Sequence, residues 1–183
     1  MNVIETKLPG VLLIEPRVFG DERGYFFESY QAERYAAAGI TTRFVQDNIS
    51  RSTKGILRGM HFQLGRPQAK FVMVTEGEVF DVAVDIRRGS PNFGQWFGTI
   101  LSESNKRQMF IPEGFAHGFV VTSEIAVFQY KCSDYYAAEE ERGLRWNDPA
   151  IGIEWPVTNP ILAERDAAFP LLEDADLPKY EAP

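Results

Sequence analysis

The segment Leu57-Arg58-Gly59-Met60-His61-Phe62 combines the residue types with the clearest chemical potential in the chain, an arginine and one of its two histidines. A neutral imidazole is well suited to take a proton near neutral pH, and an arginine offers a planar fork of donors to a phosphate or carboxylate. In a regular strand, Arg58 and His61 would point to opposite faces, unless Gly59 allows a kink or bulge. The pair would suit an enzyme that removes an acidic C–H proton from a phosphorylated substrate. A core histidine beside a surface arginine is the alternative at this point.

The second histidine ends the motif Pro112-Glu113-Gly114-Phe115-Ala116-His117, in which proline and glycine favour a tight turn. The spacing is similar to the second motif of cupins, most of which bind a metal through two histidines and a glutamate of a first motif and one histidine of the second. With only His61 and His117 in the chain, that full set is impossible. Two histidines and carboxylates could still form a facial triad for iron, but we expect no metal.

Short β-strands dominate the pattern from Gly55 to Cys132. Within Val79–Asp85 the even positions are apolar, while Asp81 and Asp85 share the other face, where they must be paired or hydrated. We therefore expect one face of this strand to lie on a core and the other to line a polar cavity, in a sandwich or barrel. The predicted strands are Phe71–Thr75, Glu78–Ile86, Trp96–Leu101, Gln108–Ile111, Gly118–Val121 and Ala126–Cys132.

The N-terminal part is predicted to contain a strand pair within residues 3–15 and a turn-rich loop at Phe19–Gly24. A helix is expected over Ser29–Gly39, with the serine able to cap it and the glycine to end it. Phe44–Ser50 is β-prone and rich in amides, which could bind a nucleobase edge or simply fix a loop.

Beyond Asp134 the pattern changes to turns, with a loop or short helical turn at Ala137–Arg142 and a short helix that begins near Leu162 and ends before Pro170. The formal net charge of −7 argues against a nucleic-acid partner. The single cysteine, Cys132, excludes an intrachain disulfide and is compatible with a reducing compartment. The acidic N-terminus does not fit a signal peptide, and no apolar run approaches the length of about 18 residues that indicates a membrane span. We expect no membrane partner and a cytoplasmic location.

Five longer segments and three short ones, weak singly but specific in this order and spacing, carry a resemblance to a known family. They are Val18–Gly24, Phe44–Asn48, Leu57–Gln63, Gly77–Arg87, Phe110–Phe119, Tyr130-Lys131, Trp146–Pro149 and Arg165–Ala167. The chain resembles the dTDP-4-dehydrorhamnose 3,5-epimerases, cupin-like enzymes of dTDP-L-rhamnose synthesis. The resemblance implies a mainly β fold, a cupin-type β-sandwich or jelly-roll barrel with short peripheral helices. It further implies one domain over residues 1–183, with an N-terminal arm of about residues 1–30 at a dimer interface and a helical and loop segment at about 137–183.

The implied reaction inverts C3 and C5 of dTDP-4-dehydro-6-deoxy-D-glucose, whose C–H bonds are acidic because both carbons lie next to the C4 ketone. His61 matches the family's base and Asp166 the carboxylate that orients it. Lys70 is placed like the cation that stabilises the enolate oxygen. Tyr130 matches the acid that delivers a proton from the opposite face, although by the residues alone it could be an ordinary strand aromatic.

The remaining implied roles concern substrate binding, without any cofactor. Arg58 and Arg23 resemble the diphosphate clamps, and His117 resembles a substrate contact. The further family contacts are Phe19, Glu28, Gln46 and Asn48 around the nucleotide, some across a homodimer interface, together with Glu141 and Arg165. Residues 64–69 form a variable loop to which we assign no role.

Three alternatives remain open from the sequence. The first is a related dTDP-4-keto-sugar enzyme that inverts only C3 or shifts the ketone. The second is a metal-dependent cupin oxygenase, and the third is a sugar-binding module without catalysis, which would not require His61, Asp166, Lys70 and Tyr130 at matching positions.

Overall fold

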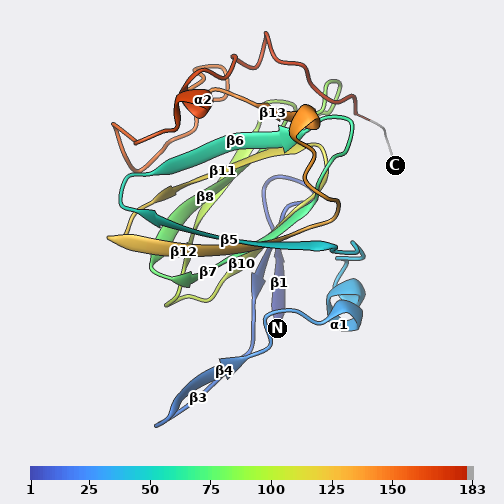
Figure 1. Ribbon diagram of the computed structural model, residues 1–183. Helices are drawn as coiled ribbons and strands as arrows, with labels where there is room; N and C mark the ends of the chain where they lie inside the picture. Colours follow the sequence, from blue (N-terminus) through green and yellow to red (C-terminus); the bar gives the residue numbers. More distant parts are fainter. Residues whose placement is uncertain (181–183) are drawn as a thin grey trace.

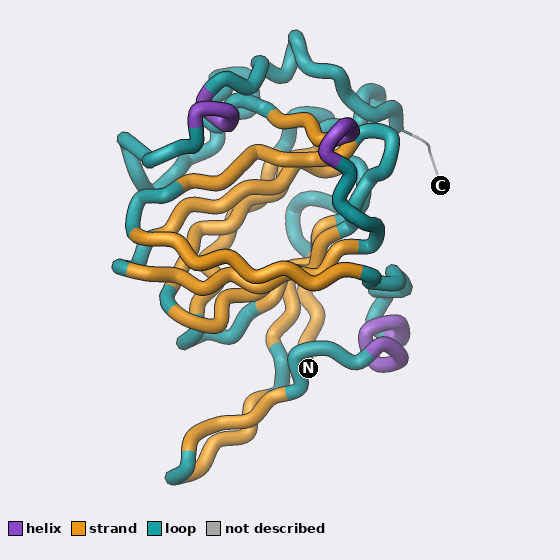
Figure 2. The backbone as a smooth tube through the Cα atoms, viewed as in Figure 1, coloured by secondary structure: helices purple, strands orange, loops and turns teal. Residues whose placement is uncertain are grey.

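The computed structural model describes residues 1–180 and consists mainly of two antiparallel sheets that face each other (Figure 1). The first sheet contains, in spatial order, β1 (Asn2–Glu5), β2 (Leu12–Glu15), β10 (Gln108–Ile111), β7 (Lys70–Glu76), β12 (Ile125–Cys132) and β5 (Gln46–Thr53). The second contains β13 (Glu141–Gly143), β6 (Leu57–Gln63), β11 (Phe115–Val121), β8 (Glu78–Asp85) and β9 (Trp96–Ser102). This arrangement confirms the predicted mainly β sandwich, and Figure 2 shows how little helix surrounds it.

The main core lies between the two sheets and is built from alternating strand residues. On β8, Val79 and Ala83 join this inner core, whereas Val82 and Val84 pack on the opposite side under the C-terminal segment. Both faces of the strand are therefore covered, and the expected polar cavity along its acidic face is largely filled by apolar side chains. Of the two alternatives for Asp81, pairing or hydration, the structure shows pairing, through its hydrogen bonds to His117.

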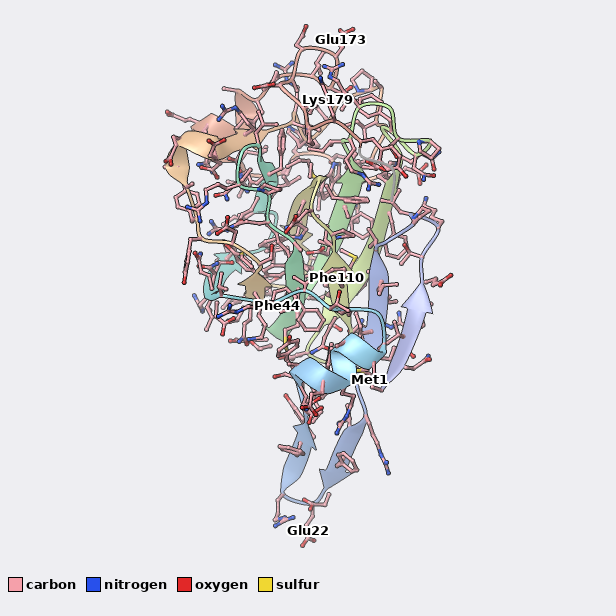
Figure 3. The ribbon with its side chains drawn as sticks, turned by 90° about the vertical axis from the view of Figure 1, so that its right-hand side faces the viewer. Met1, Glu22, Phe44, Phe110, Glu173 and Lys179 are labelled. Carbon is pink, nitrogen blue, oxygen red and sulfur yellow. The ribbon has the colours of Figure 1, made fainter. Side chains whose placement is uncertain are left out.

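A two-stranded hairpin, β3 (Val18–Asp21) and β4 (Gly24–Phe27), projects away from the sandwich with Glu22 at its tip (Figures 1 and 3). The sequence predicted a turn-rich loop here, but the turn is confined to Glu22 and Arg23. Phe19, Tyr25 and Phe26 are all exposed on it, and Phe26 reaches 69%. An apolar hairpin this open is typical of a surface that another chain covers.

The first predicted helix is shorter than expected, since α1 spans only Ala32–Ala37. Its cap is Gln31, whose side chain accepts a hydrogen bond from the backbone N–H of Arg34. Ser29 does not cap it; its carbonyl instead accepts a hydrogen bond from the Tyr35 hydroxyl. Tyr35 packs with Phe71, Phe110 and neighbouring aromatics, which fixes α1 against the first sheet (Figure 3).

The C-terminal part covers the outer face of the second sheet, where Leu144, Leu172 and Leu177 pack on β8 and its neighbours. It includes a 3₁₀ turn at Ala138–Glu140 and the short helix α2 (Glu164–Ala167), both close to the predicted positions. Residues 181–183 of the predicted C-terminal segment lie outside the described residues. Within residues 1–180, no helix has the length and apolar character needed to cross a bilayer.

Candidate active site

A bulge in β6 brings Arg58 and His61 to the same cavity. His61 pairs with His117 on β11, and Arg58 pairs with Phe119, so three steps along β6 match two steps along β11. Gly59 lies in the interval, has a φ of 123°, and a Cβ there would stand 2.7 Å from Gly118 Cα. Only glycine fits this close backbone approach. The bulge at Gly59, which the sequence left open as the condition for a shared face, is present.

Two adjoining pockets of about 220 Å³ each lie at this point between the sheets and share four lining residues: His61, Lys70, Tyr130 and Glu141. The first pocket is further lined by Gln46, Asn48, Phe62, Gln63, Gln68, Cys132 and Tyr136. The second is further lined by Ser50, Arg58, His117, Phe119, Phe128 and Arg165. The cavity thus brings most of the predicted site residues together around one shared centre.

His61 is held by Asp166, which the sequence places far away along the chain. Its Nε2 lies 2.9 Å from Asp166 Oδ1, while the other carboxylate oxygen accepts a hydrogen bond of 3.1 Å from the Gly59 N–H. Burial alone would raise the pKa of Asp166, but the hydrogen bonds and charges of its neighbours outweigh it and lower the pKa. The anionic carboxylate can therefore hold the Nε2–H, which leaves Nδ1 as the basic atom of the ring.

Tyr130 and Lys70 enter the cavity from the first sheet, opposite His61 on the second. Burial raises the pKa of Tyr130, so that its phenol keeps its proton at neutral pH. Burial lowers the pKa of Lys70, against the opposing effects of nearby Cys132, Asp81 and Glu141. Within residues 1–180, no hydrogen bond or ion pair occupies the Lys70 ammonium, which leaves it available to a ligand.

His117 is 6% exposed and reaches the second pocket beside Phe128, on which its ring stacks. Its Nε2 lies 3.0 Å from both carboxylate oxygens of Asp81. Burial lowers the pKa of His117, which favours the neutral imidazole. The predicted contact residue is thus oriented by a carboxylate, as His61 is.

Glu141 and Arg165 form one charged group at the mouth of the cavity. Arg165 Nη1 donates to Glu141 Oε2 at 2.6 Å, and the Tyr136 hydroxyl donates to the same oxygen at 2.8 Å. Arg165 also donates to Asp166 Oδ1 through Nε at 3.3 Å. This arginine therefore links Glu141 to the carboxylate that holds His61.

The inner face of β5 supplies a row of polar groups along the cavity. Gln46, Asn48 and Ser50 line it in alternation, and Gln46 Nε2 donates to Asn48 Oδ1 at 3.1 Å. Further along, Arg58 Nε donates to Ser52 Oγ at 3.0 Å. Within the described residues Arg58 has no carboxylate partner, so its charge is free for an anion. The expected amide contacts therefore lie on β5, and the Arg58 guanidinium reaches the end of this row from β6.

Four predicted site residues do not line the cavity: Asp166, which acts through His61, and Phe19, Arg23 and Glu28, which have no contact with the cavity of their own chain. Phe19 and Arg23 lie on the projecting hairpin, where Arg23 donates to Asp21 in solvent. Glu28 follows the hairpin and accepts a hydrogen bond from Arg34 at 2.7 Å. If Phe19, Arg23 and Glu28 contribute to a site, that site belongs to another chain.

Several lining residues were not among the sequence predictions: Ser50, Gln63, Gln68, Phe119, Phe128 and Tyr136. Gln68 falls in the loop to which no role was assigned, and Cys132, interpreted as core, is buried but touches the first pocket. Ser50 follows the two-residue period of Gln46 and Asn48, a signal that could have been used. Gln68 and Tyr136 carry no such signal, because loop geometry positions them. Within residues 1–180, no three His, Cys, Asp or Glu side chains group so as to hold a metal ion.

The family model for dTDP-4-dehydrorhamnose 3,5-epimerase matches residues 5–174. The chain belongs to this family. It is 57% identical to the dTDP-4-dehydrorhamnose 3,5-epimerase of Salmonella typhimurium over 96% of its own length and 97% of the relative. The epimerase of Pseudomonas aeruginosa is 56% identical, with 96% and 98% of the two chains covered. The family assignment makes the protein an enzyme of the isomerase class, as predicted.

The fold agrees with solved structures of the same family. The crystal structure of a dTDP-6-deoxy-D-glucose-3,5-epimerase from Legionella pneumophila, in complex with dTDP-4-keto-L-rhamnose, has a TM-score of 0.96 and 55% identity over 99% of both chains. A 3'-monoepimerase from Streptomyces bikiniensis, in complex with dTDP-quinovose, has a TM-score of 0.89 and 31% identity over 96% of this chain and 92% of that one. The likeness therefore extends to enzymes that invert one carbon.

Proposed function

We propose that the chain converts dTDP-4-dehydro-6-deoxy-D-glucose to dTDP-4-dehydro-L-rhamnose by inverting C3 and C5, as a step of dTDP-L-rhamnose synthesis. The observation that carries the proposal is the placement of His61 and Tyr130 on opposite sheets around one cavity, with Lys70 beside them. The dTDP-4-keto sugar bound to the Legionella relative supports the same substrate class for this chain.

Proton removal is assigned to His61. Its Nδ1 takes the proton from C3 or C5, the C–H electron pair moves into the enolate, and the charge that develops on O4 is stabilised by the Lys70 ammonium. Asp166 holds the ring during the step and stabilises the imidazolium that results.

Proton return is assigned to Tyr130. Its hydroxyl delivers a proton to the same carbon from the other face, the enolate reverts to the ketone, and the configuration is inverted. Solvent then removes the proton from His61 and returns one to Tyr130, so the enzyme ends the turnover unchanged. No cofactor is required, because the proton and the electron pair both stay within substrate, protein and water.

Substrate binding is assigned to the polar side of the cavity. The nucleotide lies along the inner face of β5, with Gln46 and Asn48 as contacts and Arg58 on the diphosphate. His117, Glu141 and Arg165 complete this chain's contribution. Phe19, Arg23 and Glu28 act on the site of a second copy, which makes the enzyme a homodimer with its N-terminal arm at the interface. We propose a single domain and a cytoplasmic location, as the sequence predicts.

The second candidate is a 3-epimerase, favoured by the likeness to the Streptomyces bikiniensis monoepimerase. One experiment separates the two. The purified protein is incubated with dTDP-4-dehydro-6-deoxy-D-glucose in D2O, and the product is identified by NMR. Inversion and deuterium at both C3 and C5 support the first proposal, deuterium and inversion at C3 alone support the second, and an unchanged sugar contradicts both.

A further inference from the structure

Asp81 is a buried carboxylate that the proposed reaction leaves without a role. It lies at 0% exposure on β8, and within the described residues its only hydrogen-bonding partner is His117. Asp85 on the same face is equally buried, but it accepts hydrogen bonds from Arg87 and from Ser90. A buried carboxylate is costly unless its charge is compensated, and a hydrogen bond from a neutral imidazole supplies no charge.

Lys70 presents the complementary problem, since it is a cation in a confined cavity without a contacting anion among residues 1–180. The titratable and charged groups that surround it from the packed elements are His61 on β6, Asp81 on β8, His117 on β11, Tyr130 and Cys132 on β12, Tyr136 in the loop after β12, Glu141 on β13, and Arg58 and Arg165 across the cavity. Burial lowers the pKa of Lys70, and Cys132, Asp81 and Glu141 oppose this effect. These three groups are therefore the candidates for a counter-charge.

Two of the three are poor candidates. Burial raises the pKa of the Cys132 thiol, so the thiol is neutral near pH 7. Glu141 already accepts hydrogen bonds from Arg165 and Tyr136. Asp81 remains, and burial raises its pKa while His117 and Lys70 oppose that rise. Asp81 is hydrogen-bonded to His117, whose ring lines the second pocket together with Lys70, so the carboxylate lies one side chain away from the pocket that holds the ammonium.

We propose that Asp81 is a positioning residue for the epimerisation: it supplies the counter-charge that keeps Lys70 an ammonium and fixes the ring of His117. The inference rests on the proposed function, because Lys70 must be charged to stabilise an enolate. With Asp81 accepting the His117 Nε2–H, the ring's Nδ1 remains an acceptor for the substrate.

The test compares Asp81→Asn with Asp85→Asn in pH profiles of kcat for deuterium exchange into the 4-keto sugar. Asparagine keeps the size and the acceptor oxygen of Asp81 but removes its charge, so Lys70 should lose its proton at lower pH than in the wild type. We expect the variant to lose about tenfold more activity at about pH 9 than at about pH 7, relative to wild type. Asp85→Asn removes a buried carboxylate from the same face and should change thermal stability without changing the shape of the profile.

Further variants keep the inference testable if Asp81→Asn folds poorly. In the Lys70→Arg background, the fall of kcat at alkaline pH should be the same with and without Asp81→Asn. The reason is that a guanidinium stays charged without a nearby counter-charge. Asp81→Glu keeps the charge, so the pH dependence of its kcat at alkaline pH should match that of the wild type even if kcat itself falls. An NMR titration of the Lys70 ε-methylene group in the unliganded protein reports the same change without any turnover.

The outcomes distinguish the inference from the proposed function. A uniform loss at every pH in Asp81→Asn, with an unchanged Lys70 titration, would show that Asp81 is only structural. A pH dependence of kcat in Asp81→Glu that differs from that of the wild type at alkaline pH would equally overturn the counter-charge role. If the wild-type protein neither exchanges nor epimerises the sugar, the proposed function fails, while the NMR titration still decides whether Asp81 sets the charge of Lys70.

Discussion

His61 and Tyr130 reach the cavity from opposite sheets, and this separation leads to different expectations for their removal. His61→Ala should abolish both deuterium exchange and epimerisation, with a loss of at least about 10²–10⁴-fold, because no base remains. Tyr130→Phe keeps the base, so exchange should persist while inversion slows more strongly. NMR in D2O measures both quantities in one sample.

The matched control for Tyr130→Phe is Tyr135→Phe, since Tyr135 is 57% exposed and lines neither pocket. It should behave as wild type. Exchange that survives in His61→Ala, or that falls in strict proportion to inversion in Tyr130→Phe, would show that the two faces are assigned to the wrong residues.

Arg58 gives a prediction about binding rather than chemistry. If its unpaired guanidinium holds the diphosphate, Arg58→Ala should weaken dTDP binding by one to two decades, since a charge-assisted hydrogen bond contributes about 1.5–3 kcal/mol. Arg58→Lys should restore only part of the affinity, because an ammonium lacks the planar fork. Calorimetry with dTDP and with thymidine measures the difference.

Arg51→Ala is the control, because Arg51 is exposed on β5 and does not line the cavity. It should leave both affinities unchanged. Equal weakening of dTDP and thymidine binding in Arg58→Ala would count against a phosphate contact.

At the scale of elements, the bulge in β6 decides whether Arg58 and His61 share a face, and Gly59→Ala should remove it. The substituted residue would face both a φ of 123° and a Cβ contact of 2.7 Å with Gly118 Cα. We expect a loss of stability above the roughly 1–2 kcal/mol typical of an unfavourable left-handed backbone, together with a large loss of activity. Thermal unfolding and the exchange assay measure the two effects.

Gly55→Ala separates the causes, because Gly55 also has a positive φ of 80° but a Cβ there meets nothing within 4 Å. Gly55→Ala should lose only the roughly 1–2 kcal/mol of stability that the unfavourable backbone conformation costs, and it should keep its activity. If both alanine variants lose the same stability and keep the same activity, the close approach at Gly59 is not what shapes the site.

At the scale of the whole molecule, the projecting hairpin predicts a homodimer in which each arm completes the partner's site. Stable interfaces of this kind bury upward of roughly 2,000 Å², and light scattering would detect the dimer. Arg23→Ala and His61→Ala should each be inactive alone, yet a co-expressed mixture should regain activity. In a mixed dimer, one of the two sites has both an intact His61 and an intact Arg23 from the other chain, so random pairing restores up to about a quarter of the wild-type sites.

Co-expression of His61→Ala with Asp166→Asn is the control for this complementation. His61 and Asp166 meet within one chain at 2.9 Å, so each site takes both residues from the same chain. Since each variant chain lacks one of the two, no mixed dimer contains an intact pair, and the mixture should not exceed the mean of its two components. A fully active monomer, or rescue in the control but not in the Arg23 mixture, would refute the shared site.

Much of the fold followed from the sequence alone, because strand alternation and turn residues are local signals. The strands Gln108–Ile111, Glu78–Ile86 and Ala126–Cys132 lie within one residue of their predicted bounds at each end. The bulge at Gly59 was one of two outcomes that the sequence left open, and the register of β6 against β11 decided between them. The family also followed, because ordered segments along the whole chain are more specific than any single motif.

The tertiary structure decided what depends on contacts between distant segments. The pairing of Asp81 with His117 and the position of Tyr136 at the cavity mouth arise from strand register and from a loop, neither of which a local pattern encodes. The cap of α1 by Gln31 likewise depends on where the chain leaves the hairpin. The sequence by itself determined which residues could react, whereas the packing of two sheets decided which of them face each other, because burial and charge compensation act across the fold and not along the chain.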